Sequence, residues 1–510
     1  MSHLITSPVL IPLLAGIVLL MVRDQNISAK RAISIVSLLM QLACALLLLK
    51  TVGTGDILTY ALGNWPAPYG IVLVADRLAT WILTITALLA IFAFTYATLN
   101  TDRAGRHFHV LFQLQLFGLN GAFLTGDLFN LFVFFEILLL ASYGLMLHGG
   151  GRLRTKASLH FVVINLAGST VFLFAVGALY GVVGTLNMAD LAQKIANVPA
   201  ENVVLVKAAG LLLFSVFALK AALLPLYLWL PAGYAQTSAP VAALFTIMTK
   251  VGAYSILRVY SLIYGSNAGA SAHLIERWLL PLALASLIVG VIGVLGSKHL
   301  RVQIAYLVVA SVGTLFVAFG INSTQSISAG LYYLPHTTFA SAALFLLADA
   351  IANRRGAVAD KLDAGPVIAS PRLLGGIFLV LAMLVAGLPP FSGFLGKLML
   401  LKSAVNHTAM PWVMGVVLVS GLLTMIAMAR TGSLLFYKAN AAYIEELSSH
   451  KVRVAPFAKT DARELVSIIG LLSLCLMMTI WAEPIIVFTQ ATAEQLFNPM
   501  QYINAVLSQS

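Results

Sequence analysis

The sequence predicts an all-α integral membrane protein with about 14 transmembrane helices. Three observations predict this fold class: 60% of the 510 residues are hydrophobic, only 9% are charged, and long apolar runs recur along the whole chain. Soluble domains carry about 25% charged residues, and an apolar run of about 18 residues or more is long enough to cross a bilayer as a helix. We expect residues 1–510 to form a single polytopic membrane domain.

Glycine, proline and charged residues separate the apolar runs and delimit the expected helices. Their expected limits are 4–22, 32–50, 77–99, 108–125, 128–148, 157–182, 203–230, 238–263, 277–297, 301–320, 327–352, 373–402, 411–432 and 464–487. Between the second and third runs, residues 53–75 mix Gly, Pro and Trp and predict an ordered turn or hairpin. Residues 433–463 predict a polar loop, which we interpret as a candidate docking surface.

The basic residues are distributed unevenly among the expected loops. Of the 30 Lys and Arg residues, 20 lie in loops after odd-numbered helices, and 7, including Arg258, in loops after even-numbered helices. Because cytoplasmic loops are enriched in Lys and Arg, we expect the odd-numbered loops in the cytoplasm and both termini outside. The net charge of +12 then reflects membrane topology, so we expect no nucleic-acid partner.

Two expected helices contain proline and glycine at positions that would interrupt them. The seventh carries Pro225 and Pro231, and the twelfth carries Pro389 and Pro390. Proline removes a backbone donor and clashes with the preceding turn. Because the two broken helices lie five helices apart, we expect two inverted five-helix repeats, helices 4–8 (about 108–263) and 9–13 (about 277–432). Helices 1–3 and 14 would flank these repeats.

Four ionisable side chains interrupt apolar spans: Glu136, Lys220, Lys250 and Lys397. A charge near the membrane midplane costs about 2.5–3.5 kcal/mol on insertion scales and usually marks an ion or proton route. We interpret the four as proton-relay residues, with carbonyls freed near Pro225 as acceptors for Lys220. Structural alternatives remain: a static Glu136–Lys220 ion pair, local pairing of Lys250 with carbonyls, and extension of Lys397 to the interface.

The remaining polar residues of the spans give weaker signals. His336 follows a proline within the eleventh helix, and its spacing fits a proton shuttle and a buried structural histidine equally well. His160 lies one turn from a basic loop, and Asp349 is expected at a solvated helix end. Cys44 and Cys475 form no CxxC pair, so we expect no iron–sulfur or zinc site. The sequence contains no nucleotide-binding or hydrolase motif, and we expect neither cofactor nor enzymatic activity.

Several segments resemble a known family of membrane proteins. They are LGNWPAPYGIVLVADRL, DLFNLFVFFEILLLASYGL, KAALLPLYLWLPAGY and APVAALFTIMTKVGAYSILR. The chain is similar over nearly its whole length to the proton-translocating subunits shared by respiratory complex I and the Mrp-type (Pha/Mnh) cation/proton antiporters, and most resembles the D-type subunits of the Mrp antiporters. The resemblance implies that Glu136, Lys220, Lys250, His336 and Lys397 form a proton relay.

By this resemblance, we expect one component of a multi-subunit antiporter that exchanges Na⁺ or K⁺ for H⁺ in a bacterial inner membrane. Its partners would be the other Mrp-type subunits and the lipid bilayer. Two alternatives remain open. The chain could be an antiporter-like, proton-pumping component of a complex I or membrane hydrogenase type redox complex, which has the same core residues. It could also be a structural scaffold whose cation path lies in a partner.

Overall fold

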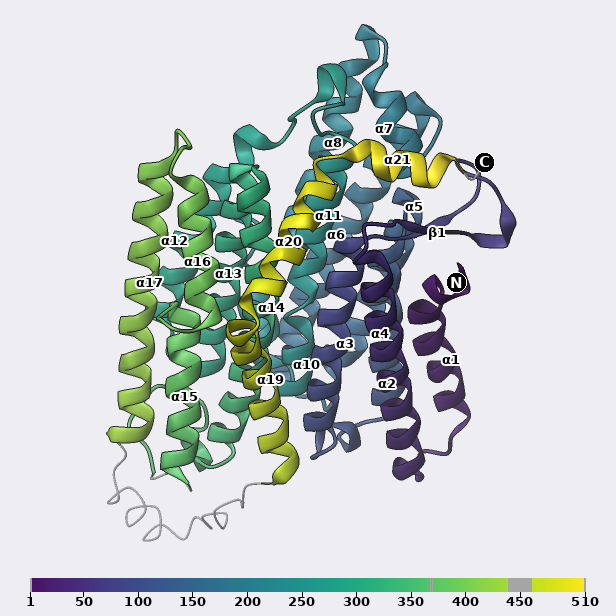
Figure 1. Ribbon diagram of the computed structural model, residues 1–510. Helices are drawn as coiled ribbons and strands as arrows, with labels where there is room; N and C mark the ends of the chain where they lie inside the picture. The colour runs from purple at the N-terminus through teal and green to yellow at the C-terminus, as the bar shows by residue number, and fades with distance from the viewer. Residues whose placement is uncertain (1, 367, 369, 439–460, 509–510) are drawn as a thin grey trace.

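The protein is a helical bundle with a small β-hairpin, as the computed structural model shows (Figure 1). The structure describes residues 2–366, 368, 370–438 and 461–508. Of the described helices, 11 are long and apolar enough to cross a membrane, and three shorter helices are also apolar. The predicted class, an all-α membrane protein, is confirmed. Most of the candidate docking loop, 433–463, lies outside the described residues.

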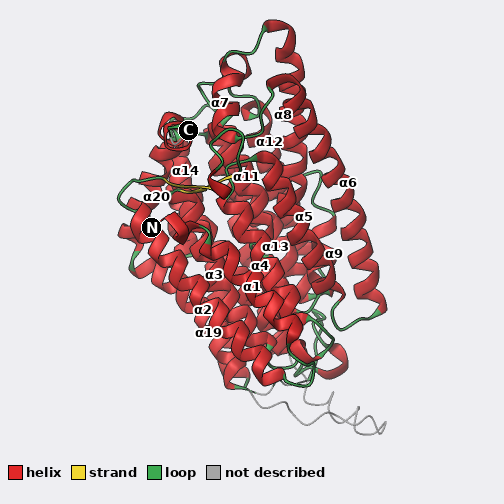
Figure 2. Cartoon of the chain, turned by 90° about the vertical axis from the view of Figure 1, so that its right-hand side faces the viewer, coloured by secondary structure: helices red, strands yellow, loops and turns green. Residues whose placement is uncertain are grey.

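The long helices stand side by side and run the height of the bundle (Figures 1 and 2). Up to the first interrupted span the helices are α1 Ser7–Met21, α2 Ile27–Val52, α3 Arg77–Ala97, α4 Phe108–Leu124, α5 Leu128–Leu147, α6 Arg152–Val183, α7 Met188–Ala196 and α8 Ala200–Ala221. The helices that follow are α9 Trp229–Gln236, α10 Ala239–Phe245, α11 Met248–Leu262, α12 Glu276–Gly296, α13 Leu300–Ile321, α14 Thr324–Ala352, α15 Pro371–Ala386, α16 Ser392–Ala404, α17 Met410–Gly432, α19 Ala462–Ile480, α20 Ala482–Leu496 and α21 Pro499–Leu507.

The loop between α2 and α3 forms the hairpin that the sequence predicts. Strand β1 (Leu58–Ala61) pairs antiparallel with β2 (Val72–Ala75), with Leu58 opposite Ala75. The hairpin lies near α7 and α21, at the end of the bundle that we call the hairpin end (Figure 1). The opposite end carries loops 22–26, 98–107 and 148–151, and we call it the basic end.

The two spans that the sequence predicts to be broken, the seventh and the twelfth, are interrupted in the structure. Helix α8 ends at Ala221 and α9 begins at Trp229, while α15 ends at Ala386 and α16 begins at Ser392. The first interruption is held by side chains: Trp229 Nε1 donates to the Leu219 carbonyl at 3.0 Å, and the Leu224 amide donates to Ser286 Oγ at 2.8 Å. Freed backbone groups at membrane depth are therefore satisfied within the protein.

The innermost helices are α10, α11, α13 and α14, and nearly all of their side chains are buried. Helices α2, α6 and α17 lie at the periphery and expose apolar side chains, among them Leu39, Leu166 and Leu422. Exposed apolar side chains are expected where a helix faces lipid or another membrane subunit. The polar side chains of the four inner helices consequently lie away from the bundle surface.

The C-terminal segment differs from its prediction. The sequence predicts one helix over 464–487, but α19 ends at Ile480, and α20 and α21 continue the chain to Leu507. In Figure 1, α20 runs obliquely over the bundle and α21 turns across the hairpin end. Tyr332 of α14 donates its hydroxyl to the Met478 carbonyl at 2.8 Å, at the end of α19. The expectation is wrong because a second apolar run, Ile485–Phe488, lies in the next helix α20 and hides the end of α19 at Ile480.

The expected position of Arg258 is also corrected by the structure. The count of basic residues assigns it to a loop although the expected helix 238–263 contains it, and the structure places it within α11 with 4% exposure. Its guanidinium contacts the Asp76 carboxylate, with an Nη1–Oδ2 distance of 2.7 Å, and stacks 5.1 Å from the Tyr502 ring. A buried arginine is tolerated because its charge is paired and hydrogen-bonded.

Candidate functional site

Glu136 and Lys220 face helix α6 and do not contact each other. Ser169 of α6 donates its hydroxyl to the Glu136 carboxylate, and Lys220 Nζ donates to Asn165 Oδ1 of the same helix at 3.3 Å. Lys220 is 7% exposed, and its Nζ lies 5.9 Å from the Phe135 ring centroid. Within the described part of the chain, the carboxylate and the ammonium form no direct ion pair. Each charge is instead held by a neutral polar group.

The carbonyls freed by the first break do not bind Lys220, contrary to the expectation. The Leu219 carbonyl accepts from Trp229, and α8 ends in a left-handed residue, Ala222, whose amide returns to the Leu219 and Ala218 carbonyls. The indole and the helix cap therefore occupy these acceptors, and Lys220 turns toward α6.

Lys250 is completely buried in α11. Among the described residues its Nζ has no hydrogen-bond partner, so it does not pair with local carbonyls. Gly252 allows α11 to pack tightly against α8, because an added Cβ there would lie 2.5 Å from the Ala221 amide nitrogen. This packing brings the Lys250 turn next to the end of α8. An unpartnered buried amine is costly, which favours a functional interpretation.

His336 and Lys397 line one small cavity at the second break. His336 is 1% exposed and its Nδ1 lies 2.9 Å from Ser392 Oγ, at the start of α16. Lys397 Nζ donates to the Ala386 carbonyl at 2.9 Å, at the end of α15. The cavity holds about 30 Å³ and is also lined by hydroxyl groups, including Ser311. That volume accommodates one or two water molecules.

The five predicted site residues form two groups: Glu136 with Lys220, and His336 with Lys397 and Lys250. Glu136 lies within electrostatic reach of Lys220, whereas Lys250 and Lys397 both lie within electrostatic reach of His336. Lys220, Lys250 and His336 are buried, whereas Glu136 and Lys397 are half-buried. Such groups can bind, release and pass protons when water or hydroxyl groups connect them.

Three neutral residues of this site were missed by the sequence reasoning: Asn165, Ser169 and Ser392. The spacing of Asn165 and Ser169 indicates a shared polar face, because side chains four residues apart lie on the same face of a helix. Asn165 and Ser169 have this spacing inside the apolar run 157–182. Ser392 gives a weaker signal, since serine is common at helix starts.

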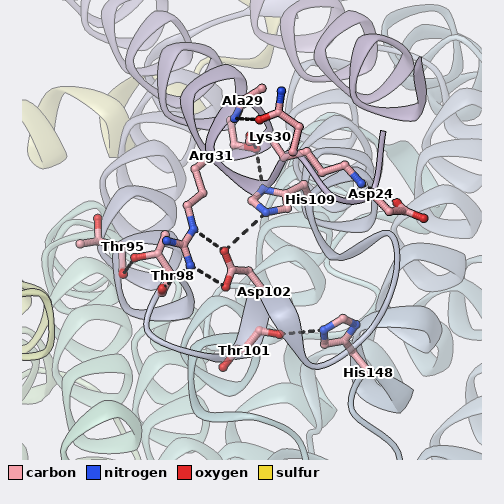
Figure 3. Close-up of polar contacts among 12 residues, drawn as sticks. Asp24, Ala29, Lys30, Arg31, Thr95, Thr98, Thr101, Asp102, His109 and His148 are labelled. Carbon is pink, nitrogen blue, oxygen red and sulfur yellow. Dashed lines mark hydrogen bonds and ion pairs between the residues drawn. The ribbon is translucent and has the colours of Figure 1, made fainter. Parts of the chain in front are cut away.

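A second polar cluster lies at the basic end, around Asp102 (Figure 3). Arg31 donates from Nε to Asp102 Oδ2 at 2.6 Å and from Nη2 to Oδ1 at 3.0 Å. His109 Nε2 lies 3.6 Å from the same carboxylate, and its Nδ1 lies 3.0 Å from Ser34 Oγ. Burial opposes ionisation of Asp102, but the nearby His109 imidazole and the hydrogen-bonded Arg31 guanidinium outweigh it and lower the pKa of Asp102 to about 2.

The structure places the other polar candidates away from the five predicted site residues. His160 is exposed on α6. Asp349 lies at the basic end, where Arg301 and the Tyr96 hydroxyl donate to it, the latter at 2.9 Å. Its neighbour in sequence, Arg354, pairs instead with Glu464 at 2.7 Å. Across the described ranges, no group of three or more His, Cys, Asp or Glu side chains could hold a metal ion.

The fold and the buried charges define a polytopic membrane protein with ionisable groups inside its helical bundle. The family described as "NADH:quinone oxidoreductase/Mrp antiporter, TM" matches residues 125–424, which include Glu136, Lys220, Lys250, His336 and Lys397. The chain belongs to this family.

Similarity to known proteins extends over the full chain. It is 39% identical to the probable K(+)/H(+) antiporter D-type subunit of Rhizobium meliloti, covering 100% of this chain and 98% of that protein. It is 35% identical to the Na(+)/H(+) antiporter D-type subunit of Alkalihalophilus pseudofirmus, covering 100% of both.

Two solved structures are similar to the fold. A chain of the Mrp complex from Dietzia sp. DQ12-45-1b matches with a TM-score of 0.86 and 27% identity, over 99% of both chains. A chain of respiratory complex I from Thermus thermophilus matches with a TM-score of 0.75 and 23% identity, over 97% of this chain and 99% of that one. The second likeness concerns the fold alone.

Proposed function

We propose that this chain is the D-type subunit of a multi-subunit antiporter and moves protons in exchange for Na⁺ or K⁺. The observation that carries the proposal is Lys250, a fully buried amine that has no hydrogen-bond partner among the described residues and lies within electrostatic reach of His336. The names of the relatives support the same role, since they are K⁺/H⁺ and Na⁺/H⁺ antiporter subunits. Because these relatives differ in cation, either ion is compatible with the proposal.

The proposed relay runs from Glu136 and Lys220 through Lys250 to His336 and Lys397. A proton that binds near Lys250 alters the attraction between Glu136 and Lys220. At an effective dielectric constant of about 20, moving two unit charges from about 4 to about 8 Å changes their interaction by about 2 kcal/mol. That change alters a proton-binding equilibrium about 30-fold. The Glu136–Lys220 distance can therefore control proton affinity along the path.

The cavity between His336 and Lys397 supports the distal half of the relay. The imidazole, the ammonium and the surrounding hydroxyl groups of Ser311, Thr314 and Ser420 face a space large enough for water. Protons can pass along such a chain of hydroxyl groups and water to Lys397. The carbonyls of Val385 and Ala386 then hold the charged form of that lysine.

The proposal includes a membrane arrangement. Fourteen spans would form two inverted repeats, about 108–263 and 277–432, with the interrupted pairs α8/α9 and α15/α16 at corresponding positions. The basic end would face the cytoplasm of a bacterial inner membrane, with both termini near the opposite face. The other subunits of the complex would contact its lipid-side helices and supply the cation path.

Exchange assays in membrane vesicles test the proposal. The complete complex is expressed in a host without other antiporters, and the dissipation of ΔpH is followed after addition of Na⁺ or K⁺. We expect Glu136→Ala, Lys220→Ala and Lys250→Ala to lower exchange at least tenfold while the complex assembles on native gels. Lys207→Ala, on the same helix as Lys220, is the control and should exchange normally. Normal exchange by all three relay variants would refute the relay, and loss through failed assembly alone would favour a scaffold.

A further inference from the structure

Helix α6 contributes the direct polar contacts of both members of the Glu136–Lys220 pair. Ser169 donates to the Glu136 carboxylate, and Asn165, one turn earlier, accepts from Lys220 Nζ at 3.3 Å. Asn165 is 1% exposed and Ser169 is 6% exposed, so the Asn165–Lys220 contact is shielded from solvent and the Ser169–Glu136 contact is partly shielded. Two neutral groups on one helix face thus hold opposite charges of two other helices.

The orientation of Asn165 is fixed by its own backbone. Its Nδ2 donates to the Phe161 carbonyl at 2.9 Å, so its carbonyl oxygen is directed to Lys220. Helix α6 packs against α8 at Gly168, where an added Cβ would lie 2.4 Å from Leu219 Cδ2. The neighbouring Lys220 is therefore within reach of a short side chain such as asparagine.

The charges have alternative partners available. A buried carboxylate and a buried ammonium are stabilised by hydrogen bonds or by each other. If Asn165 or Ser169 is removed, the charge it held loses its neutral partner and gains most by approaching the opposite charge. Tyr143, on the same helix as Glu136, is a further titratable group within electrostatic reach of that carboxylate, and Lys250 lies on α11, which packs against the end of α8.

We propose that Asn165 and Ser169 are positioning residues that hold Lys220 and Glu136 apart, so that α6 sets the balance between separated and paired states of the relay. This proposal rests on the proposed function, because it assigns the residues that control the relay's first step. If the proposal is correct, proton exchange requires a neutral side chain at position 165. A carboxylate at this position would keep the acceptor but bind Lys220 as a permanent counter-ion.

The test uses the complete complex in vesicles and compares substitutions at Asn165 and Ser169. We expect Asn165→Leu to lower ΔpH exchange at least tenfold, and Asn165→Asp to lower it as strongly although an oxygen acceptor is retained. A merely structural acceptor role would leave Asn165→Asp active. Ser169→Ala should lower exchange at least fivefold, and Ser169→Thr, which restores a hydroxyl, should recover it.

Thr170→Val is the matched control, because Thr170 adjoins Ser169 but is exposed, and within the described part of the chain its hydroxyl bonds only to the Leu166 carbonyl of its own helix. It should exchange at the wild-type rate. Wild-type exchange by Asn165→Asp, or by Ser169→Ala, would overturn the inference. If the Asn165 variants fail to assemble on native gels, the comparison of Ser169→Ala with Ser169→Thr decides the question. Ser169→Ala removes a single oxygen atom and is the smallest change to the fold. Inactive Lys250→Ala combined with active α6 variants would refute this inference alone, whereas active Lys250→Ala would refute the relay itself.

Discussion

Lys397 Nζ lies 2.9 Å from the carbonyl oxygen of Ala386, so the lysine of one half-helix holds the C-terminal end of the other. The last carbonyls of a helix lack intrahelical donors and carry partial negative charge. Gly387 makes the contact possible: it adopts φ +83, and an added Cβ there would lie 3.0 Å from Lys397 Nζ. The break in this span thus creates a cation-binding position, and the lysine does not extend to the interface.

The first prediction separates a proton carrier from a fixed charge at Lys397. Arginine keeps a positive charge on the α15 carbonyls but does not release its proton at any accessible pH. Lys397→Arg should therefore assemble normally and lose at least tenfold in ΔpH exchange in vesicles. Lys402→Arg, on the same helix, should retain full exchange. An active Lys397→Arg complex would mean that only the charge matters.

The second prediction concerns the stability cost of Lys250. A buried polar group without a hydrogen-bond partner costs about 1–3 kcal/mol. Lys250 is fully buried, and its amine has no hydrogen-bond partner among the residues described. Lys250→Leu should therefore leave the thermal unfolding temperature of the purified complex equal or raise it, while exchange falls at least tenfold. Lys207→Leu is the control for replacing a lysine. A clear drop in unfolding temperature with Lys250→Leu would reveal a structural role for this amine.

The sequence predicts the spans, the two breaks and the charged members of the site, because each depends on a local signal. Long apolar runs identify α3 and α13, and the prolines identify both interruptions. The lysines are conspicuous because a charge in an apolar span is expensive. These features require no knowledge of which helices become neighbours.

The partners of the charges depend on packing and escape such reasoning. Asn165 is 55 residues from Lys220, and Asp76 is 182 residues from Arg258. Neither pairing follows from periodicity or composition, since only the arrangement of α3, α6, α8 and α11 brings these side chains together. The sequence favours a loop for Arg258 because a lone arginine is most stable at the interface, and its buried partner is not visible from the sequence.

The third prediction tests the Asp76–Arg258 pair. Arg258→Met leaves the buried Asp76 carboxylate without its counter-ion, which costs about 3–5 kcal/mol. Asp76 also caps α3 by accepting from the Ala79 amide at 2.9 Å. The double variant Asp76→Asn and Arg258→Met keeps a capping oxygen and removes both charges. Its unfolding temperature should therefore lie well above that of Arg258→Met alone, and equal values for the two would contradict this account.

The last prediction concerns pH and the Asp102 cluster. The pKa of Asp102 is lowered from 3.8 to about 2, since His109 and Arg31 favour the carboxylate more strongly than burial opposes it. A carboxyl whose pKa is lower in the folded state stabilises the fold fully above its unfolded pKa and loses this effect as the pH falls toward its folded pKa. The contribution should be on the order of 2 kcal/mol above about pH 4 and should disappear toward pH 2.

Asp102→Asn should therefore lower the unfolding temperature of the complex at pH 7, and the difference from wild type should shrink as the pH falls from about 5 to about 2. Thermal unfolding followed by tryptophan fluorescence at successive pH values measures this difference. Asp363→Asn, which removes an exposed carboxylate near the same end, is the control and should give a small difference at every pH. A difference for Asp102→Asn that is equally large at pH 7 and pH 2 would mean that shape and hydrogen bonding hold this loop, independent of the charge on Asp102.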